Sequence, residues 1–135
     1  MQAPTVEPIH FEDVVGLPEV HADARRTIYE RIEHTDQGIA RTSRSVVTAD
    51  EAVLGNHYHD FDQRFRGRGA GILYTAPKDN PTAVAAQQLP EDGWQFIIPA
   101  GMVMALRLHK GAVQIFESNQ DYQDGANTHH VAIAS

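Results

Sequence analysis

Short apolar runs alternate with glycine, proline and polar turns along most of this chain. Runs of about four to eight residues with alternating or continuous apolar positions are typical of strands. Strands are predicted at 27–32, 39–47, 53–59, 71–74, 82–88, 94–98, 103–108, 112–118 and 130–134. No segment keeps a helical period over a useful length. Many short strands at close spacing predict an all-β barrel or sandwich.

Two glycine-containing stretches predict how these strands are joined or bent. Gly67 and Gly69 are expected to form a hairpin turn before the strand that begins at Gly71. The dipeptide Gly55-Asn56 lies inside the strand 53–59, where it is suited to a β-bulge.

Composition removes several classes of function. The 135 residues carry a formal net charge of −7 and include no cysteine, which excludes disulfides and thiolate chemistry. Nucleic acids need clustered cations, and the one basic cluster, Arg64, Arg66 and Arg68, alternates as exposed strand positions do, so no nucleic-acid partner is expected. No apolar run is long enough for a membrane span, so no membrane partner is expected. Residues 1–20 do not have the pattern of a secretory signal, and a cytoplasmic location is therefore expected.

His57 and His59 form the main candidate for chemistry. They are two positions apart in a predicted strand, so both rings should lie on one face of the sheet. Two neutral imidazoles can begin a metal site, and they can equally serve as a general acid/base pair. A structural alternative is that one ring is a buried hydrogen-bonding group and the other has no role.

A second motif gives this pair a context. The sequence Gly93-Trp-Gln-Phe-Ile-Ile-Pro99-Ala-Gly101 predicts a strand that ends in a turn. Together with Gly55-Asn-His57-Tyr-His59, it resembles the paired signature of the cupin family, which are small β-barrels with a polar site inside. The resemblance implies an all-β, single-domain cupin (jelly-roll) β-barrel with an N-terminal strand extension.

The chain is longer than a minimal barrel of this family. We expect residues 51–135 to form the barrel core and residues 1–50 to form an extension. The extension would add strands to the barrel or to a dimer interface. Because edge strands invite pairing and two-fold dimers are the commonest assembly, a homodimer is expected.

The family pattern also says where a metal would bind. It places a carboxylate a few residues after the second histidine and a histidine three residues after the final glycine, and these positions are Gln63 and Met104 here. Neither an amide nor a thioether is a usual ligand for the hard or borderline metals of cupins. We therefore favour no cofactor. A divalent metal, if bound, would be held by His57, His59 and Gln63, or by the pair and an outside residue such as His109.

The run from Gly55 to Phe65 looks like the sugar-modifying cupins of nucleotide-sugar pathways. These include dTDP-sugar 3,4-ketoisomerases and proteins described as sugar epimerases. In them, the resemblance implies that two histidines move protons around an enediol without a metal, a role that would fall on His57 and His59. We therefore expect a metal-independent isomerase or epimerase acting on a nucleotide-linked keto-deoxysugar.

Such a reaction needs further groups around the pair. A base removes the α-proton, an acid returns it, and a donor polarises the carbonyl. Tyr74 or Tyr122 are candidates for that donor, whereas Tyr58 should face away. The candidate substrate-binding residues are Gln63, Arg64, Arg66, Arg107, Trp94 and Met104. The three arginines could hold a diphosphate, or could simply form a solvated strand face. Trp94 and Met104 could equally belong to the core.

Two other functions stay open. The first is a cupin lyase or dehydratase, or a metal-dependent cupin enzyme, acting on a small keto or hydroxy compound through the same histidines. The second is a non-catalytic small-molecule-binding cupin, in which the histidine pair only hydrogen-bonds a ligand.

Overall fold

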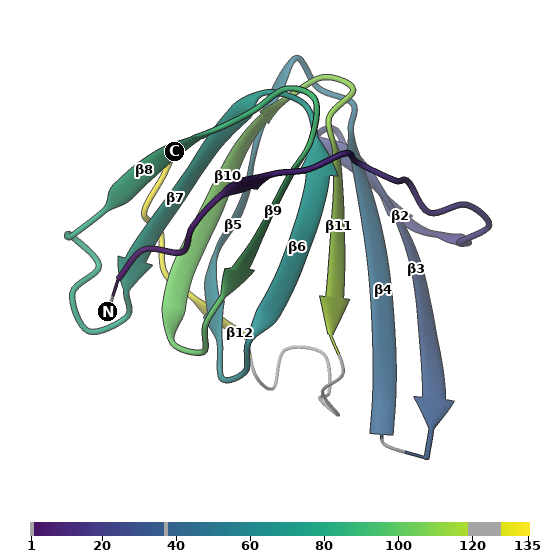
Figure 1. Cartoon of the computed structure of the whole chain (residues 1–135), viewed down its shortest axis with the longest axis horizontal. Coiled ribbons are helices and arrows are strands. Elements are labelled where there is room, and N and C mark those ends of the chain that lie inside the picture. The colour runs from purple at the N-terminus through teal and green to yellow at the C-terminus, as the bar shows by residue number, and fades with distance from the viewer. Residues whose placement is uncertain (1, 37, 119–127) are drawn as a thin grey trace.

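The computed structural model describes residues 2–36, 38–118 and 128–135 (Figure 1). Its regular structure within these ranges consists of twelve β-strands. No helix of the described residues is long and apolar enough to cross a lipid bilayer. The expected all-β class is therefore confirmed.

The strands follow one another closely along the chain. They are β1 (Glu7–Pro8), β2 (Glu19–Ala22), β3 (Arg26–Thr35), β4 (Gly38–Val47), β5 (Glu51–His59), β6 (Gln63–Arg68), β7 (Gly71–Pro77), β8 (Ala85–Leu89), β9 (Trp94–Ile98), β10 (Met102–His109), β11 (Val113–Ser118) and β12 (Thr128–His130).

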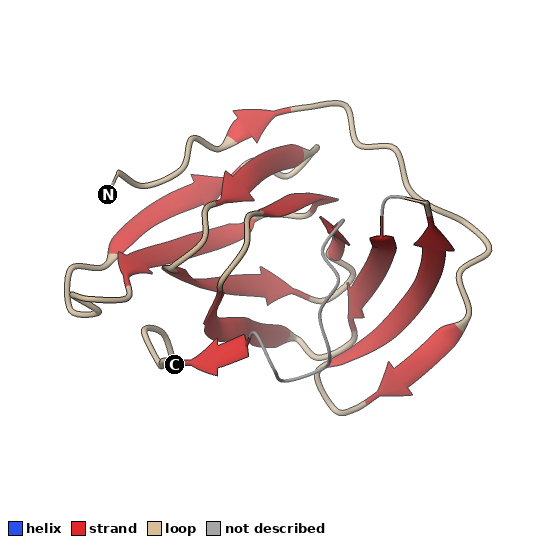
Figure 2. Ribbon diagram, turned by 90° about the horizontal axis from the view of Figure 1, so that it is seen from below, coloured by secondary structure: helices blue, strands red, loops and turns tan. Residues whose placement is uncertain are grey.

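Two antiparallel sheets enclose one interior. The larger sheet has the order β1-β9-β6-β11-β4-β3-β2, and the smaller has the order β12-β5-β10-β7-β8. Seen from below, the strands of the two sheets are arranged around a common interior (Figure 2). This arrangement is the double-sheet jelly roll, as predicted.

The strands of the first 50 residues belong to the larger sheet. β4 lies between β11 and β3, while β2 forms the outer edge and β1 pairs with β9. The β3–β4 hairpin extends past the ends of the neighbouring strands (Figure 1). Both sides of the division drawn at residue 50 therefore contribute to the same sheet.

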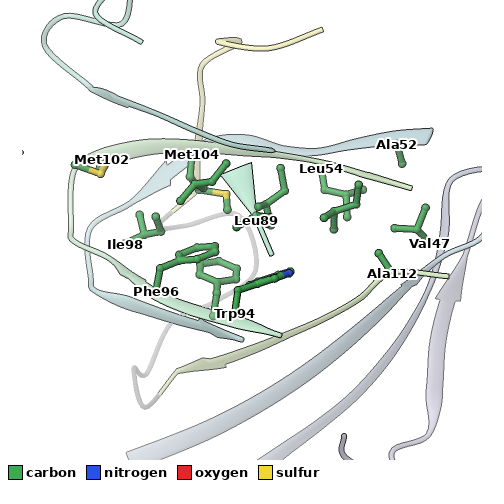
Figure 3. Close-up of a cluster of buried hydrophobic side chains, with 14 residues drawn as sticks. Val47, Ala52, Leu54, Leu89, Trp94, Phe96, Ile98, Met102, Met104 and Ala112 are labelled. Atoms are coloured by element: carbon green, nitrogen blue, oxygen red, sulfur yellow. The ribbon is translucent and has the colours of Figure 1, made fainter. Parts of the chain in front are cut away.

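One half of the interior, here called the apolar half, is filled by buried hydrophobic side chains (Figure 3). The Trp94 ring is wholly buried and stacks on Phe96, which in turn stacks on Phe65, with ring centroids 5.5 and 5.3 Å apart. The Trp94 indole Nε1–H donates a hydrogen bond to the Gly69 carbonyl at 3.1 Å. This half is therefore well packed, and its one indole donor is satisfied.

Three predicted boundaries differ from the structure. Gly67 lies inside β6 rather than in the turn, and of the two glycines only Gly69 has a positive φ. A glycine is needed at position 67 because a Cβ there would come within 2.6 Å of the Trp94 ring. The strand predicted at 82–88 begins only at Ala85. The strand predicted at 130–134 ends at His130, because the following backbone is held by a side chain instead of a ladder.

Candidate functional site

A bulge in β5 aims the histidine pair into the interior. Ala105 pairs with Gly55 and Met104 pairs with His57, which leaves Asn56 as the extra residue. Gly55 and Asn56 have φ values of 97° and 58°, and a Cβ on Gly55 would lie 2.8 Å from the Met104 carbonyl oxygen. The predicted bulge is confirmed.

The bulge changes which residues face inward. Before it, Ala52 and Leu54 are buried in the core. A regular strand would continue this alternation with position 56, but the extra residue shifts the inward set to His57 and His59. The bulge is therefore the local cause of the site.

The side chain of Asn56 ties the C-terminal residues to the bulge. Its Oδ1 accepts from the amides of Ile133 and Ala134 at 2.9 and 3.1 Å, and its Nδ2–H donates to the Ala134 carbonyl at 2.9 Å. Nearby, β12 pairs with β5 and places Thr128 opposite His59 and His130 opposite His57. The end of the chain is therefore part of the wall beside the histidines.

The histidines open into a cavity of about 320 Å³ between the two sheets. We call this part of the interior the polar half. It is lined by Val20, His21, Arg26, Ile28, Glu30, Arg41, Ser43, Ser45, His57, His59, Gln63, Phe65, Gln114 and Phe116.

Neighbouring strands place the polar side chains of this cavity at matching levels. Ser45 of β4 pairs with Ile28 of β3 on one side and with Gln114 of β11 on the other. Residues that pair directly point to the same face of a sheet. At this level the wall of β3, β4 and β11 therefore carries two polar side chains, Ser45 and Gln114, beside the apolar Ile28.

His57 is the more perturbed of the two histidines. Burial, followed by the neighbouring His59 and His130 rings, lowers its pKa to about 4. The His57 and His59 rings lie 4.8 Å apart in an edge-on arrangement. The Nδ1 atom of His57 is buried and has no hydrogen-bond partner in the described part of the chain. At neutral pH this ring is uncharged and has one nitrogen available to a ligand.

His59 is held more firmly. It is only 7% exposed, its Nδ1 lies 3.3 Å from the Thr128 hydroxyl, and its ring packs on Phe61 with centroids 4.9 Å apart. Such an outer contact fixes the orientation of a ring. Thr128 could not be found from the sequence, because nothing in its neighbourhood marks it as the partner of β5.

The arginines of the cavity come from the first 50 residues. Arg41 of β4 forms an ion pair with Glu30 of β3 at 3.1 Å. Arg26 of β3 has a buried Nε without a hydrogen-bond partner among the described residues, and burial lowers its pKa. Neither arginine was among the candidates from the sequence. The signal that could have found them is alternation, because each lies two residues before another residue that lines the cavity, Ile28 in β3 and Ser43 in β4.

The three arginines proposed from the sequence point away from the cavity. β6 buries Gln63, Phe65 and Gly67, so Arg64 and Arg66 face outward by alternation. Arg66 pairs with Glu117 at 3.1 Å, and Arg64 lines a separate surface hollow near β1. The structure thus does not bring this pair to the histidines.

Arg107 and Tyr74 also lie on an outer face. Tyr74 pairs with Ala105 in the ladder, and the Arg107 Nε–H donates to the Tyr74 hydroxyl at 3.3 Å. Arg107 also contacts the Glu51 carboxylate and the Ser135 carbonyl oxygen. Tyr74 is therefore not placed to polarise a carbonyl in the cavity, and Tyr122 lies outside the described residues.

The remaining candidates divide between the two halves. Gln63 is 3% exposed and lines the cavity, whereas Trp94 and Met104 are buried in the apolar half. Tyr58 faces away as expected and stacks on His129, with ring centroids 4.6 Å apart.

The residues present do not fit the metal that the cupin fold implies. The described residues contain no group of three histidine, cysteine, aspartate or glutamate side chains placed to hold a metal ion. The two positions that would complete the set are the amide Gln63 and the buried thioether Met104. His109 pairs with Glu51 at the other end of β5, so it does not join the histidines.

Comparisons with known proteins identify the fold. No family model matches the chain, and no curated protein matches it. Among solved structures, it is similar to the capsular polysaccharide assembling protein CapF from Staphylococcus aureus, with a TM-score of 0.67 and 18% identity over 86% of this chain and 33% of that one. It is also similar to vicilin from Corylus avellana (hazelnut), with a TM-score of 0.56 and 18% identity over 75% of this chain and 31% of that one.

A third similar structure is an 11S globulin from Wrightia tinctoria, whose description reports an auxin binding site. Its TM-score is 0.59, with 11% identity over 81% of this chain and 29% of that one. The chain therefore spans about a third of the length of each of these proteins. These likenesses show that the chain has the cupin jelly-roll fold.

Proposed function

We propose that this chain is a cupin enzyme that moves a proton next to the carbonyl group of a nucleotide-linked keto-deoxysugar, without a metal. The reaction would be an isomerisation or an epimerisation. The observation that carries this proposal is His57, which is a neutral, partly buried imidazole whose buried Nδ1 has no partner among the described residues, in a cavity beside a second histidine.

The geometry suits a stepwise proton transfer. A neutral His57 accepts the α-proton through Nδ1, and the resulting enediol takes a proton back at the neighbouring carbon or on the opposite face. Because the pKa of His57 is lowered to about 4, its protonated form is a stronger acid than an ordinary imidazolium and returns the proton more readily. His59, with its ring held by Thr128 and Phe61, is the second proton carrier.

The comparisons are consistent with this proposal at the level of the fold. A structure described as a capsular polysaccharide assembling protein shares the jelly roll, and its name refers to carbohydrate. The donor set described above, which lacks a third metal ligand among the described residues, supports a metal-free route.

Solvent proton exchange tests the proposal directly. The protein would be mixed in D₂O and chelator with 4-keto-6-deoxyhexoses linked to dTDP, UDP or GDP, and the α-proton signal followed by NMR. We expect loss of that signal with at least one substrate. His57→Asn should slow the exchange by about 10²- to 10⁴-fold, while Tyr58→Phe, on the outer face, should leave it unchanged. Absence of exchange with all three substrates would refute the proposal.

A second candidate function is a binding protein without turnover. Its support is the same low pKa of His57, which keeps the ring uncharged and suits it to hydrogen-bond a ligand. A globulin that is similar to this chain over 29% of its own length is described with an auxin binding site. Binding of a sugar nucleotide without any deuterium incorporation would favour this candidate.

We further propose that two copies of the chain associate through the β2 edge and the projecting β3–β4 hairpin. All four residues of β2 are exposed, and Val20 and Ile32 expose apolar side chains there. An open edge strand with apolar side chains is suited to pair with a second copy. Sedimentation equilibrium should give a dimer mass, and a monomer at micromolar concentration would contradict this proposal.

A further inference from the structure

Three buried polar atoms face the cavity without a hydrogen-bond partner in the described ranges. They are His57 Nδ1, Arg26 Nε and Gln114 Oε1. An unpaired buried polar atom costs free energy, and such atoms in a native cavity are accounted for by a ligand or by water. The first atom belongs to the proposed proton transfer, which leaves one donor and one acceptor on the opposite wall.

The donor and the acceptor come from separate strands of one wall. Arg26 pairs with Val47 at the end of the β3–β4 ladder, and Gln114 pairs with Ser45, two residues away along β4. Both side chains therefore start from the same sheet face, two strands apart, and line the same cavity.

The charges in the cavity define what this wall can bind. Arg41 and Glu30 neutralise each other through their ion pair, and His57 is uncharged. Among the described residues that line the cavity, Arg26 is therefore left without an acidic partner, because the one glutamate, Glu30, pairs with Arg41. A buried guanidinium binds the planar oxygens of a carboxylate or phosphate with charge-assisted hydrogen bonds.

We infer that Arg26 and Gln114 form a subsite for one oxyanion of the substrate, carboxylate or phosphate, together with a neighbouring hydroxyl group. Arg26 binds the oxyanion, and the Gln114 Oε1 atom accepts from the hydroxyl. The inference rests on the proposed function, because it places the sugar between this wall and His57. It also moves anion recognition from β6 and β10 to the N-terminal strands.

Binding of simple probes tests the subsite without any turnover. Calorimetric titrations would use inorganic pyrophosphate, UDP, dTDP and D-glucuronate, with D-glucose as the uncharged control. We expect at least one anionic probe to bind in the millimolar range or tighter, and D-glucose to bind more weakly. Pyrophosphate and the nucleotides report a phosphate ligand, and D-glucuronate reports a carboxylate ligand.

Matched variants assign the binding to these residues. Arg26→Gln should weaken the anionic probe by about 10- to 100-fold. Arg31→Gln makes the same charge change on the same strand, but its side chain contacts the Gly16 carbonyl outside the cavity, so it should change binding by less than about twofold. Gln114→Leu should weaken D-glucuronate while leaving pyrophosphate unchanged.

Arg26→Lys keeps the folded protein available if Arg26→Gln fails to fold, and it should also weaken binding by losing the bidentate geometry. Equal binding by the wild type and the Arg26 variants would overturn the inference, as would absence of binding for all four anionic probes. Loss of binding in Arg26→Gln without any proton exchange in the wild type would keep the subsite and remove the proposed function. Exchange that survives in Arg26→Gln with unchanged KM would keep the function and remove the subsite.

Discussion

The apolar and polar halves of the interior share β4, β5 and β6 but differ in how they treat polar atoms. In the apolar half the one indole nitrogen donates to a carbonyl, and aromatic rings fill the space around it. In the polar half, buried nitrogen and oxygen atoms face a cavity without protein partners in the described ranges. β5 supplies Leu54 to the first half and His57 to the second. The close-packed core and the polar cavity are thus separated along the length of β5.

Removing the largest core side chain gives the strongest test of this division. Trp94→Ala should lower the free energy of unfolding by about 3–5 kcal/mol, because it leaves a large cavity in the apolar half. Denaturant titration measures the change. Ile97→Ala is the matched control on β9, since Ile97 is 50% exposed, and should cost less than about 1 kcal/mol. Equal costs for the two variants would contradict the division.

Acid should act on the polar half through His57. Its pKa falls from the ordinary value of 6.5 to about 4 on folding, so the unfolded chain binds more protons between these values. Stability therefore drops as pH falls from about 6.5 to about 4, by at most about 3 kcal/mol for this group. Unfolding of the wild type and of His57→Leu should be measured across this range.

His57→Leu should lose the part of the pH dependence of stability that comes from His57. Other groups should keep their contributions, including Asp60, whose pKa is lowered by its hydrogen bond to His129. If both proteins show the same pH profile, His57 is not the group that titrates in this range.

The bulge should contribute an intermediate amount. Asn56→Ala removes three hydrogen bonds to the C-terminal residues. It also leaves alanine at a φ of 58°, a left-handed conformation that asparagine tolerates better than alanine does. We expect a loss of about 2 kcal/mol. Asn80→Ala, in an exposed loop, is the control. Amide hydrogen exchange should rise at Ile133 and Ala134 in Asn56→Ala alone, and unchanged protection there would show that the anchor is not needed.

The smallest effect has the opposite sign. Arg26→Met replaces a desolvated cation with an apolar side chain of similar length, so it should raise the free energy of unfolding by about 1 kcal/mol. Thermal unfolding without ligand measures this change. A loss of stability of similar size would mean that Arg26 contributes to folding rather than to binding.

The sequence predicted the architecture well because alternation and turn residues are local signals. Strands near the histidine motif were predicted to within a few residues, and the Gly55-Asn56 bulge was predicted correctly. Gly67 was misplaced because its environment is set by Trp94, which lies far along the chain. Local patterns do not contain that kind of contact.

The candidate site was predicted only in part. The histidines and Gln63 line the cavity: His57 and His59 share β5, and Gln63 begins β6, which is the next strand along the chain and lies in the opposite sheet. The predicted arginines do not reach the site, because alternation along β6 and β10 turns Arg64, Arg66 and Arg107 outward. Arg26 and Arg41 reach the cavity only through the pairing of β4 with β11, which no short motif reveals.

The extra residue in β5 also has a consequence for how such sequences are compared and redesigned. In a regular strand, alternate positions face inward and outward. The extra residue Asn56 shifts this alternation by one, so that even-numbered positions face inward before it and odd-numbered positions face inward after it. A comparison that aligns β5 without a gap would match core positions with surface positions on one side of residue 56. Transplanting the histidines to another barrel would then require this phase change as well as the two side chains.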